Sequence, residues 1–274
     1  MIMSGRNLKV EKATPGDVAC ILDWLKAESD EGGEESFWCN RDSISASLVD
    51  GDLWVIREDE KAIAYQVGSY SPHIVNVRKD KQRQGAGTLL FKASLARAIR
   101  DDVNVLTGEC APRSSLPFWE KLGFERYGDQ RSGEEIKVRL VLKREFKISP
   151  DLPRAEVTIG FYPEAALHRE SVAPISVHRL IGARQAGDVV QLERRAVGLT
   201  DDEPEGRDLV VRIDIDGVER CFCKAKSREA RQAGIEWDQE GQAFYVDAIQ
   251  PRVDRVSPAP HVQSFDLAKI VVHT

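Results

Sequence analysis

The chain has 274 residues, of which 42% are hydrophobic and 31% charged, a composition typical of globular proteins in water. It contains no apolar run long enough to cross a bilayer, and its first ten residues have no apolar core of the kind found in a secretory signal. Residues 1–149 carry 23 basic and 24 acidic side chains, and residues 150–274 carry 16 and 21. This balance disfavours a general nucleic-acid binder but leaves room for a local basic patch.

The five cysteines are odd in number and widely scattered. Together with the lack of a signal, this predicts reduced thiols and a cytoplasmic location. Cys221 and Cys223 alternate along a predicted strand, and we interpret them as two small strand residues because no further cysteine or histidine pair lies near them. The histidines of the second half show no metal-ligand spacing, so no metal site is expected.

The first half alternates short strands with amphipathic helices. Thr14 and Pro15 are suited to the cap and the first position of a helix. Hydrophobic periodicity predicts strands at 8–12, 53–57, 62–70, 74–77, 103–107, 124–127 and 135–142, and helices from 15 onward and at 41–48, 88–99 and 115–122. We expect the 103–107 strand to be a parallel neighbour of the 74–77 strand. The pattern predicts a mixed α/β (α+β) domain over residues 1–147.

The second half has a different pattern of predicted elements, with many strands and few helices. Two prolines mark a linker at residues 148–153. Strands are expected at 157–161, 189–197, 209–215, 219–225, 243–249 and 265–272, with a helix at 227–233, a weaker one at 164–169 and turns at 216–217 and 239–241. Residues 154–274 are therefore predicted to form a mostly β, barrel- or sandwich-like domain.

The stretch from Ile74 to Phe91 joins a strand to a helix through a glycine-containing basic turn. Gly85 and Gly87 let the backbone approach a ligand, and the free amide groups of a first helical turn attract anions. This pattern predicts a site for a diphosphate-like group. It is neither a Rossmann fingerprint, which needs a third glycine, nor a Walker loop, which needs G-K-[ST].

Two motifs carry a family resemblance. Residues 82–87, QRQGAG, resemble the acetyl-coenzyme A pyrophosphate loop of the GNAT N-acetyltransferases, [QR]-x-x-G-x-[GA]. Residues 115–124, SLPFWEKLGF, resemble that family's A-x-x-F-[YW]-E-K-L-G-F segment, with one predicted strand between the motifs. The resemblance covers residues 7–147 and says nothing about the rest of the chain. It implies direct transfer of an acetyl group from acetyl-coenzyme A to a primary amine on a small molecule, a protein or an aminoacylated RNA.

The resemblance also implies where the cofactor lies. In the family, backbone amides after the glutamine hold the pyrophosphate, and the edge of the preceding strand holds the pantetheine arm. The implied cofactor contacts here are Asn76, Val77, Arg78, Gln82, Arg83, Gln84, Gly85, Ala86, Gly87 and Thr88. The acceptor side of the cleft would lie at the first two helices, with Phe37 in their joining loop.

The catalytic residues depart from the family pattern. Trp119 stands where many family members have a tyrosine that acts as the general acid, and an indole cannot serve as a general acid at neutral pH. Ser114 or Ser115 is available as a hydroxyl, or the thiolate leaves unassisted. The candidate bases are Glu109, which follows the 103–107 strand, and then His73, which precedes the 74–77 strand.

A second function stays open at this point. Pro112 replaces the family's cofactor-contacting asparagine, and Trp119 removes its usual acid. The chain is therefore also compatible with a non-catalytic acyl-coenzyme A-binding protein whose β-rich domain binds a partner. That domain would alternatively cover the acceptor cleft or build a homodimer. The net charge of -6 favours a cationic, amine-bearing acceptor over nucleic acid.

Overall fold

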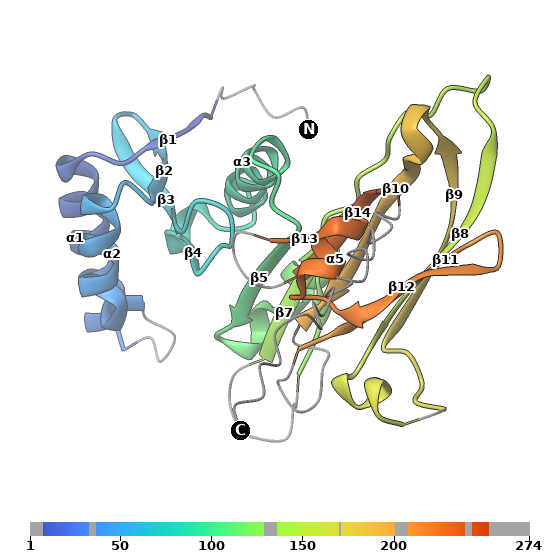
Figure 1. Cartoon of the computed structure of the whole chain (residues 1–274). Helices are drawn as coiled ribbons and strands as arrows, with labels where there is room; N and C mark the ends of the chain where they lie inside the picture. The colour runs from blue at the N-terminus through green and yellow to red at the C-terminus, as the bar shows by residue number, and fades with distance from the viewer. Residues whose placement is uncertain are drawn as a thin grey trace, which may run out of the picture.

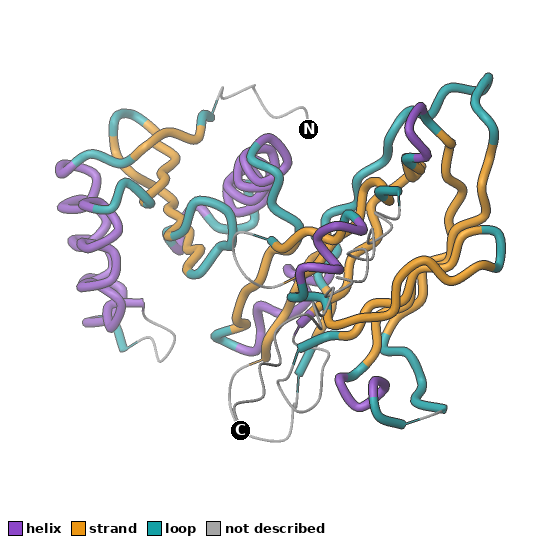
Figure 2. Tube along the Cα trace, viewed as in Figure 1, coloured by secondary structure: helices purple, strands orange, loops and turns teal. Residues whose placement is uncertain are grey.

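A computed structural model describes residues 8–32, 37–128, 136–169, 171–200, 208–238 and 243–251. The first half forms a mixed α/β arrangement and the second half a curled antiparallel sheet, as Figures 1 and 2 show. The predicted fold class is thereby confirmed. The predicted strand at 265–272 and the turn at 239–241 lie outside the described residues.

The N-terminal sheet has the order β1-β2-β3-β4 and is antiparallel throughout. Its strands are β1 (Val10–Lys12), β2 (Leu53–Glu58), β3 (Lys61–Val67) and β4 (Ile74–Val77). Helices α1 (Pro15–Asp30) and α2 (Arg41–Val49), joined through η1 (Phe37–Asn40), cover one face, and α3 (Ala86–Arg100) lies across the other (Figure 1). Apolar residues on both faces of β2 and β3 fill the two helix–sheet layers. The predicted cap is present, because Thr14 and Asp17 form a capping box.

A second, smaller sheet follows α3. It consists of β5 (Val105–Cys110), β6 (Glu125–Arg126) and β7 (Ile136–Val141) in the order β5-β7-β6, all antiparallel. Between β5 and β6 lie η3 (Arg113–Ser115) and α4 (Leu116–Lys121), which ends at Gly123 with φ of +92°. The Trp119 ring is buried and meets Phe124 edge-on, with ring centroids 5.1 Å apart. The motif at residues 115–124 therefore contributes side chains to the hydrophobic core.

The strand at 103–107, expected as a parallel-type neighbour of the 74–77 strand, does not pair with it in the described residues. Among the described residues β4 pairs with β3 alone, whereas β5 pairs with β7. The two strands belong to different sheets because the chain bends at Ser71 and Pro72 just before β4, and a proline has no amide hydrogen for a ladder.

The second half forms one seven-stranded antiparallel sheet of order β12-β11-β8-β9-β10-β14-β13. Its strands are β8 (Arg154–Tyr162), β9 (Ser176–Arg184), β10 (Val190–Leu199), β11 (Val210–Ile215), β12 (Val218–Lys224), β13 (Ile235–Trp237) and β14 (Ala243–Ile249). The sheet curls into a half-barrel with α5 (Arg228–Ala233) on its inner side (Figure 1). Short η2 (Lys79–Lys81), η4 (Glu164–Leu167) and η5 (Ala186–Asp188) complete the elements. The inner face is apolar and includes Cys221 and Cys223.

Sequence periodicity missed β9 and β13. In β9 the outward row mixes Val177 and Ile181 with Arg179, so neither face of the strand is clearly polar. The predicted hairpin is present, because Asp216 and Gly217 both have positive φ, at 51° and 78°. The weaker helix prediction at 164–169 corresponds to the short η4.

Arg195 of β10 links the two halves. Its side chain is 3% exposed and lies 4.0 Å from the Tyr245 ring centroid. The guanidinium donates to Asp247 (Nε–Oδ1, 2.7 Å) and, in the first half, to Asp102 (3.1 Å) and Asn104 (2.6 Å). Burial alone would lower the arginine pKa, but the hydrogen bonds to Asp247 and Asp102 outweigh it and raise the pKa. The boundaries 1–147, 148–153 and 154–274 remain a proposal, but the two parts contact each other through this arginine.

Replacing Arg195 by methionine should destabilise the protein by about 2 kcal/mol, because it removes the guanidinium shared by the half-buried Asp247, the exposed Asp102 and the buried Asn104. The neighbouring exposed Arg194 is the matched control, and Arg194→Met should change stability by less than about 0.5 kcal/mol. Urea unfolding followed by circular dichroism measures both. Equal midpoints for the two variants would show that the Arg195 cluster contributes little.

Candidate active site

The two N-terminal sheets part at Ser71 and Pro72. The Ser71 hydroxyl accepts a hydrogen bond from the Thr107 amide of β5 at 3.0 Å. Gly108 lies close to the same bend, because a Cβ placed on it would sit 3.8 Å from the Pro72 carbonyl oxygen. Beyond this contact β4 pairs with β3 and β5 pairs with β7, so the parting of the strands opens a cleft between them.

A cavity of about 330 Å³ lies in this cleft. Its walls come from five parts of the chain: α1, the start of η1, β4 with η2, the end of β5, and α4 with η3. The lining residues are Glu28, Phe37, His73, Ile74, Val75, Asn76, Lys79, Gln82, Glu109, Ala111, Pro112, Ser114, Ser115, Phe118 and Trp119. The cavity therefore brings together residues that are separated by almost a hundred positions in sequence.

The glycine turn has the geometry that an anion site needs. Gly85 caps α3 in the left-handed region at φ of +90°, where a side chain is disfavoured. A Cβ on Gly87 would lie 3.5 Å from the Phe118 ring, an ordinary van der Waals distance, so the first turn of α3 lies against α4 at this residue. The first amides of α3 have no partner inside the helix and carry the positive end of its dipole.

The outer edge of β4 is partly occupied by its own neighbours. The Arg78 amide donates to Ile63 of β3 at 2.9 Å, so strand alternation turns the backbone groups of Val75 and Val77 to the opposite edge. The Asn76 Oδ1 accepts from the Val77 amide at 2.7 Å, and Gln82 Nε2 donates to the Val77 carbonyl at 3.0 Å. Val75, which lines the cavity, is the residue whose edge groups face the gap.

The structure places the three candidate catalytic residues around one cavity. Glu109 and Ser114 reach it from the β5 side, and His73 reaches it from the residue before β4. Of the ten candidate cofactor residues, Asn76 and Gln82 line it, and the other eight lie outside its lining. Arg78 directs its guanidinium to Asp80 (Nε–Oδ1, 2.6 Å) and not to the gap.

Two further residues line the cavity. Ser115 lines the cavity, and its buried hydroxyl lies beside the thiol of Cys110. Glu28 lines the opposite wall and accepts from the Lys79 amide at 2.9 Å, which ties α1 to the turn after β4. Ser115 was one of two equivalent hydroxyls in the sequence, whereas nothing in the sequence marks Glu28 among the acids of α1.

The described ranges hold no group of three or more His, Cys, Asp or Glu side chains placed to share a metal ion. Within the same ranges, no helix is long and apolar enough to cross a membrane. His73 lines the cavity with Glu109, whereas His168 and His178 lie in the second half.

Comparison with known proteins matches residues 26–139 to the acetyltransferase (GNAT) domain family. No curated protein matches the chain in sequence. Similar solved structures include PH1933 from Pyrococcus horikoshii, with 17% identity and a TM-score of 0.42 over 50% of this chain and 99% of that one. A putative GNAT acetyltransferase from Desulfovibrio desulfuricans has 17% identity and a TM-score of 0.41 over 49% and 98%. A GCN5-related N-acetyltransferase from Rhodopseudomonas palustris has 18% identity and a TM-score of 0.39 over 52% and 99%.

The family match includes the end of α1, η1, β4 with η2, β5, and η3 with α4, which form the cavity walls, and it also includes the glycine turn and α3. It ends before the half-barrel begins at Arg154. Residues 26–139 therefore match the acetyltransferase (GNAT) domain family, and the match leaves the second half of the chain unassigned.

Proposed function

We propose that the protein transfers an acetyl group from acetyl-coenzyme A directly to a primary amine. The observation that carries this proposal is the parting of β4 and β5 beside the left-handed Gly85 turn. A thioester ligand would place its pyrophosphate on the amides of residues 83–88, which precede and begin α3. Its pantetheine arm would run along the free edge of β4, and its carbonyl would reach the cavity.

The chain's own groups supply the proton chemistry of this proposal. Glu109 takes a proton from the attacking amine as the first candidate base, and His73 is the second. The leaving thiolate takes its proton from water, either directly or through a hydroxyl on η3 that passes on its own proton and regains one from water in the same step. We favour Ser115 over Ser114 as this relay, because the Ser115 hydroxyl is buried at the cavity wall beside the Cys110 thiol.

The acceptor would enter from the α1 side. Glu28 and Phe37 form that wall, and a carboxylate beside an aromatic ring suits a cationic amine. The lining also contains Lys79, so the acceptor wall is mixed in charge. The identity of the acceptor, whether small molecule or protein, and a cytoplasmic site of action belong to this proposal.

The test is thiol release from acetyl-coenzyme A with a panel of primary amines. The wild-type protein should release thiol faster with at least one amine than without any. Glu109→Gln should lower kcat by about a hundredfold or more at unchanged KM for acetyl-coenzyme A, because general base catalysis contributes on that scale. Glu125→Gln, an exposed acid outside the cavity, is the matched control.

Two outcomes would contradict parts of this account. Tight coenzyme A binding without amine-dependent thiol release would favour the non-catalytic binding protein. Full activity of Glu109→Gln together with a large loss in His73→Gln would move the base to His73. Comparison of Ser115→Ala with Ser114→Ala assigns the hydroxyl by the same assay.

Gly85→Val should weaken coenzyme A binding at least tenfold, because it strains the left-handed cap and crowds the first amides of α3. Isothermal titration calorimetry measures the affinity. Gly187→Val is the matched control, since Gly187 also has a positive φ, at 76°, and open space around it but lies in the second half. Unchanged affinity of Gly85→Val for coenzyme A would show that the pyrophosphate does not bind at this turn.

A further inference from the structure

The outer face of the half-barrel carries a second cavity that the acyl-transfer site does not use. It has a volume of about 500 Å³ and lies between the η4 loop and strands β8, β11 and β12. Its lining residues are Tyr162, Ala166, Leu167, His168, Arg169, Ser171, Val172, Arg212 and Phe222. None of these described residues is acidic, although the chain as a whole has a net charge of -6.

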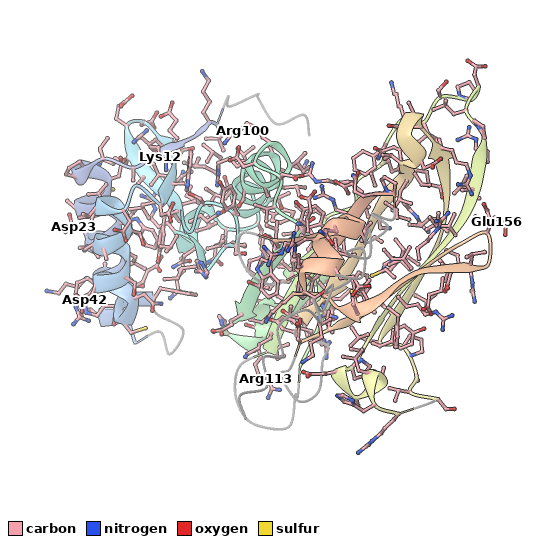
Figure 3. The ribbon with its side chains drawn as sticks, in the orientation of Figure 1. Lys12, Asp23, Asp42, Arg100, Arg113 and Glu156 are labelled. Atoms are coloured by element: carbon pink, nitrogen blue, oxygen red, sulfur yellow. The ribbon has the colours of Figure 1, made fainter. Side chains whose placement is uncertain are left out.

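Strand register places this cavity on the outward side of the sheet. Gly160 of β8 pairs with Arg212 of β11, and Arg212 pairs with Phe222 of β12. Their neighbours Phe161, Val211 and Cys223 point to the inner apolar cluster. In Figure 3, Glu156 of the same outward row of β8 lies at the right-hand edge of the molecule. The row is therefore accessible from outside.

Two aromatic rings lie on the outward face of the sheet. A Cβ on Gly160 would lie 2.6 Å from Cε2 of Tyr162, so the tyrosine ring lies over the glycine. Phe222 is 37% exposed and meets the Tyr162 ring edge-on, with centroids 6.3 Å apart. A ring that covers a glycine beside an exposed phenylalanine gives a planar ligand a surface on which to stack.

Two arginines, Arg169 and Arg212, and one histidine, His168, line the same cavity as these rings. Arg212 donates through Nε to Asp214 at 3.0 Å and has Glu219 at 3.5 Å, so part of its charge is neutralised. Its Nη1 makes no hydrogen bond within the described ranges and stays available to a ligand. His168 and Arg169 come from the loop on the opposite side of the cavity. Donors around an aromatic surface match a planar base joined to a phosphate.

We propose that this outer cavity binds a nucleotide unit, with the base stacked on the Tyr162 ring, Phe222 against the edge of the base, and the phosphate held by Arg212 and Arg169. The cavity volume suits one such unit. The unit is either a free nucleotide or part of a single-stranded RNA, since both present the same base and phosphate. This local site is compatible with an acidic chain, because it depends on a few cations and not on overall charge.

The experiment measures binding of a fluorescein-labelled single-stranded 12-nucleotide RNA by anisotropy, with saturating coenzyme A to fill any adenine-nucleotide site in the first half. Binding should weaken with added salt. Tyr162→Ala should weaken it at least about fivefold, as expected for the loss of one stacking surface. Gly160→Ala should also weaken it, because the added methyl group displaces the ring while leaving the ring present.

Arg212→Gln should weaken binding, and Arg154→Gln is its matched control. Arg154 is exposed on the outward row at the other end of β8, and it lies eight residues, or about 26 Å, from Tyr162 along the strand. Competition with CMP and UMP distinguishes the two possible ligands. Displacement of the RNA would show that a free nucleotide binds the cavity, whereas RNA binding without displacement would show that the ligand is single-stranded RNA. Absence of binding by RNA, CMP and UMP overturns the proposal. Unchanged binding by folded Tyr162→Ala and Arg212→Gln overturns it equally, with circular dichroism as the check on folding.

Discussion

The candidate site depends on the break in hydrogen bonding between β4 and β5. Ser71 contacts the Thr107 amide at 3.0 Å, and Pro72 then turns the chain into β4, which pairs on one side only. A continuous sheet would fill the gap with ladder bonds and leave no room for a ligand. Because the break precedes β4, the same short strand supplies an open edge, a cavity wall and the start of the glycine turn.

Local sequence signals predicted most of the first half. Thr14 and Pro15 mark a helix start, Gly123 marks a helix end, and Gly85 stands where the left-handed cap occurs. Each of these signals acts within a few residues, so it can be read without knowing the fold. The gathering of His73, Glu109 and Ser114 around one cavity followed only because the family resemblance supplied the arrangement of the elements.

Features set by long-range contacts could not be predicted. Glu28 is one of several acids on α1, and only the fold shows that it lines the cavity and holds the Lys79 amide. The distinction between Ser114 and Ser115 depends on which hydroxyl is buried at the cavity wall beside the Cys110 thiol. Strand β9 was missed because its outward row carries apolar residues, and the Tyr162 ring over Gly160 becomes visible only when the strands are in register. Arg195 likewise reveals its role only where the two halves meet.

A crystal structure with coenzyme A bound would locate the cofactor relative to the parted strands. The pyrophosphate should lie on the amides of residues 83–88, and a pantetheine amide should pair with the free backbone groups of Val75. The sulfur should lie in the cavity among Glu109, Ser115 and Trp119. Coenzyme A bound elsewhere, with β4 and β5 still parted and the gap between them empty, would show that this cleft is not the acyl-transfer site.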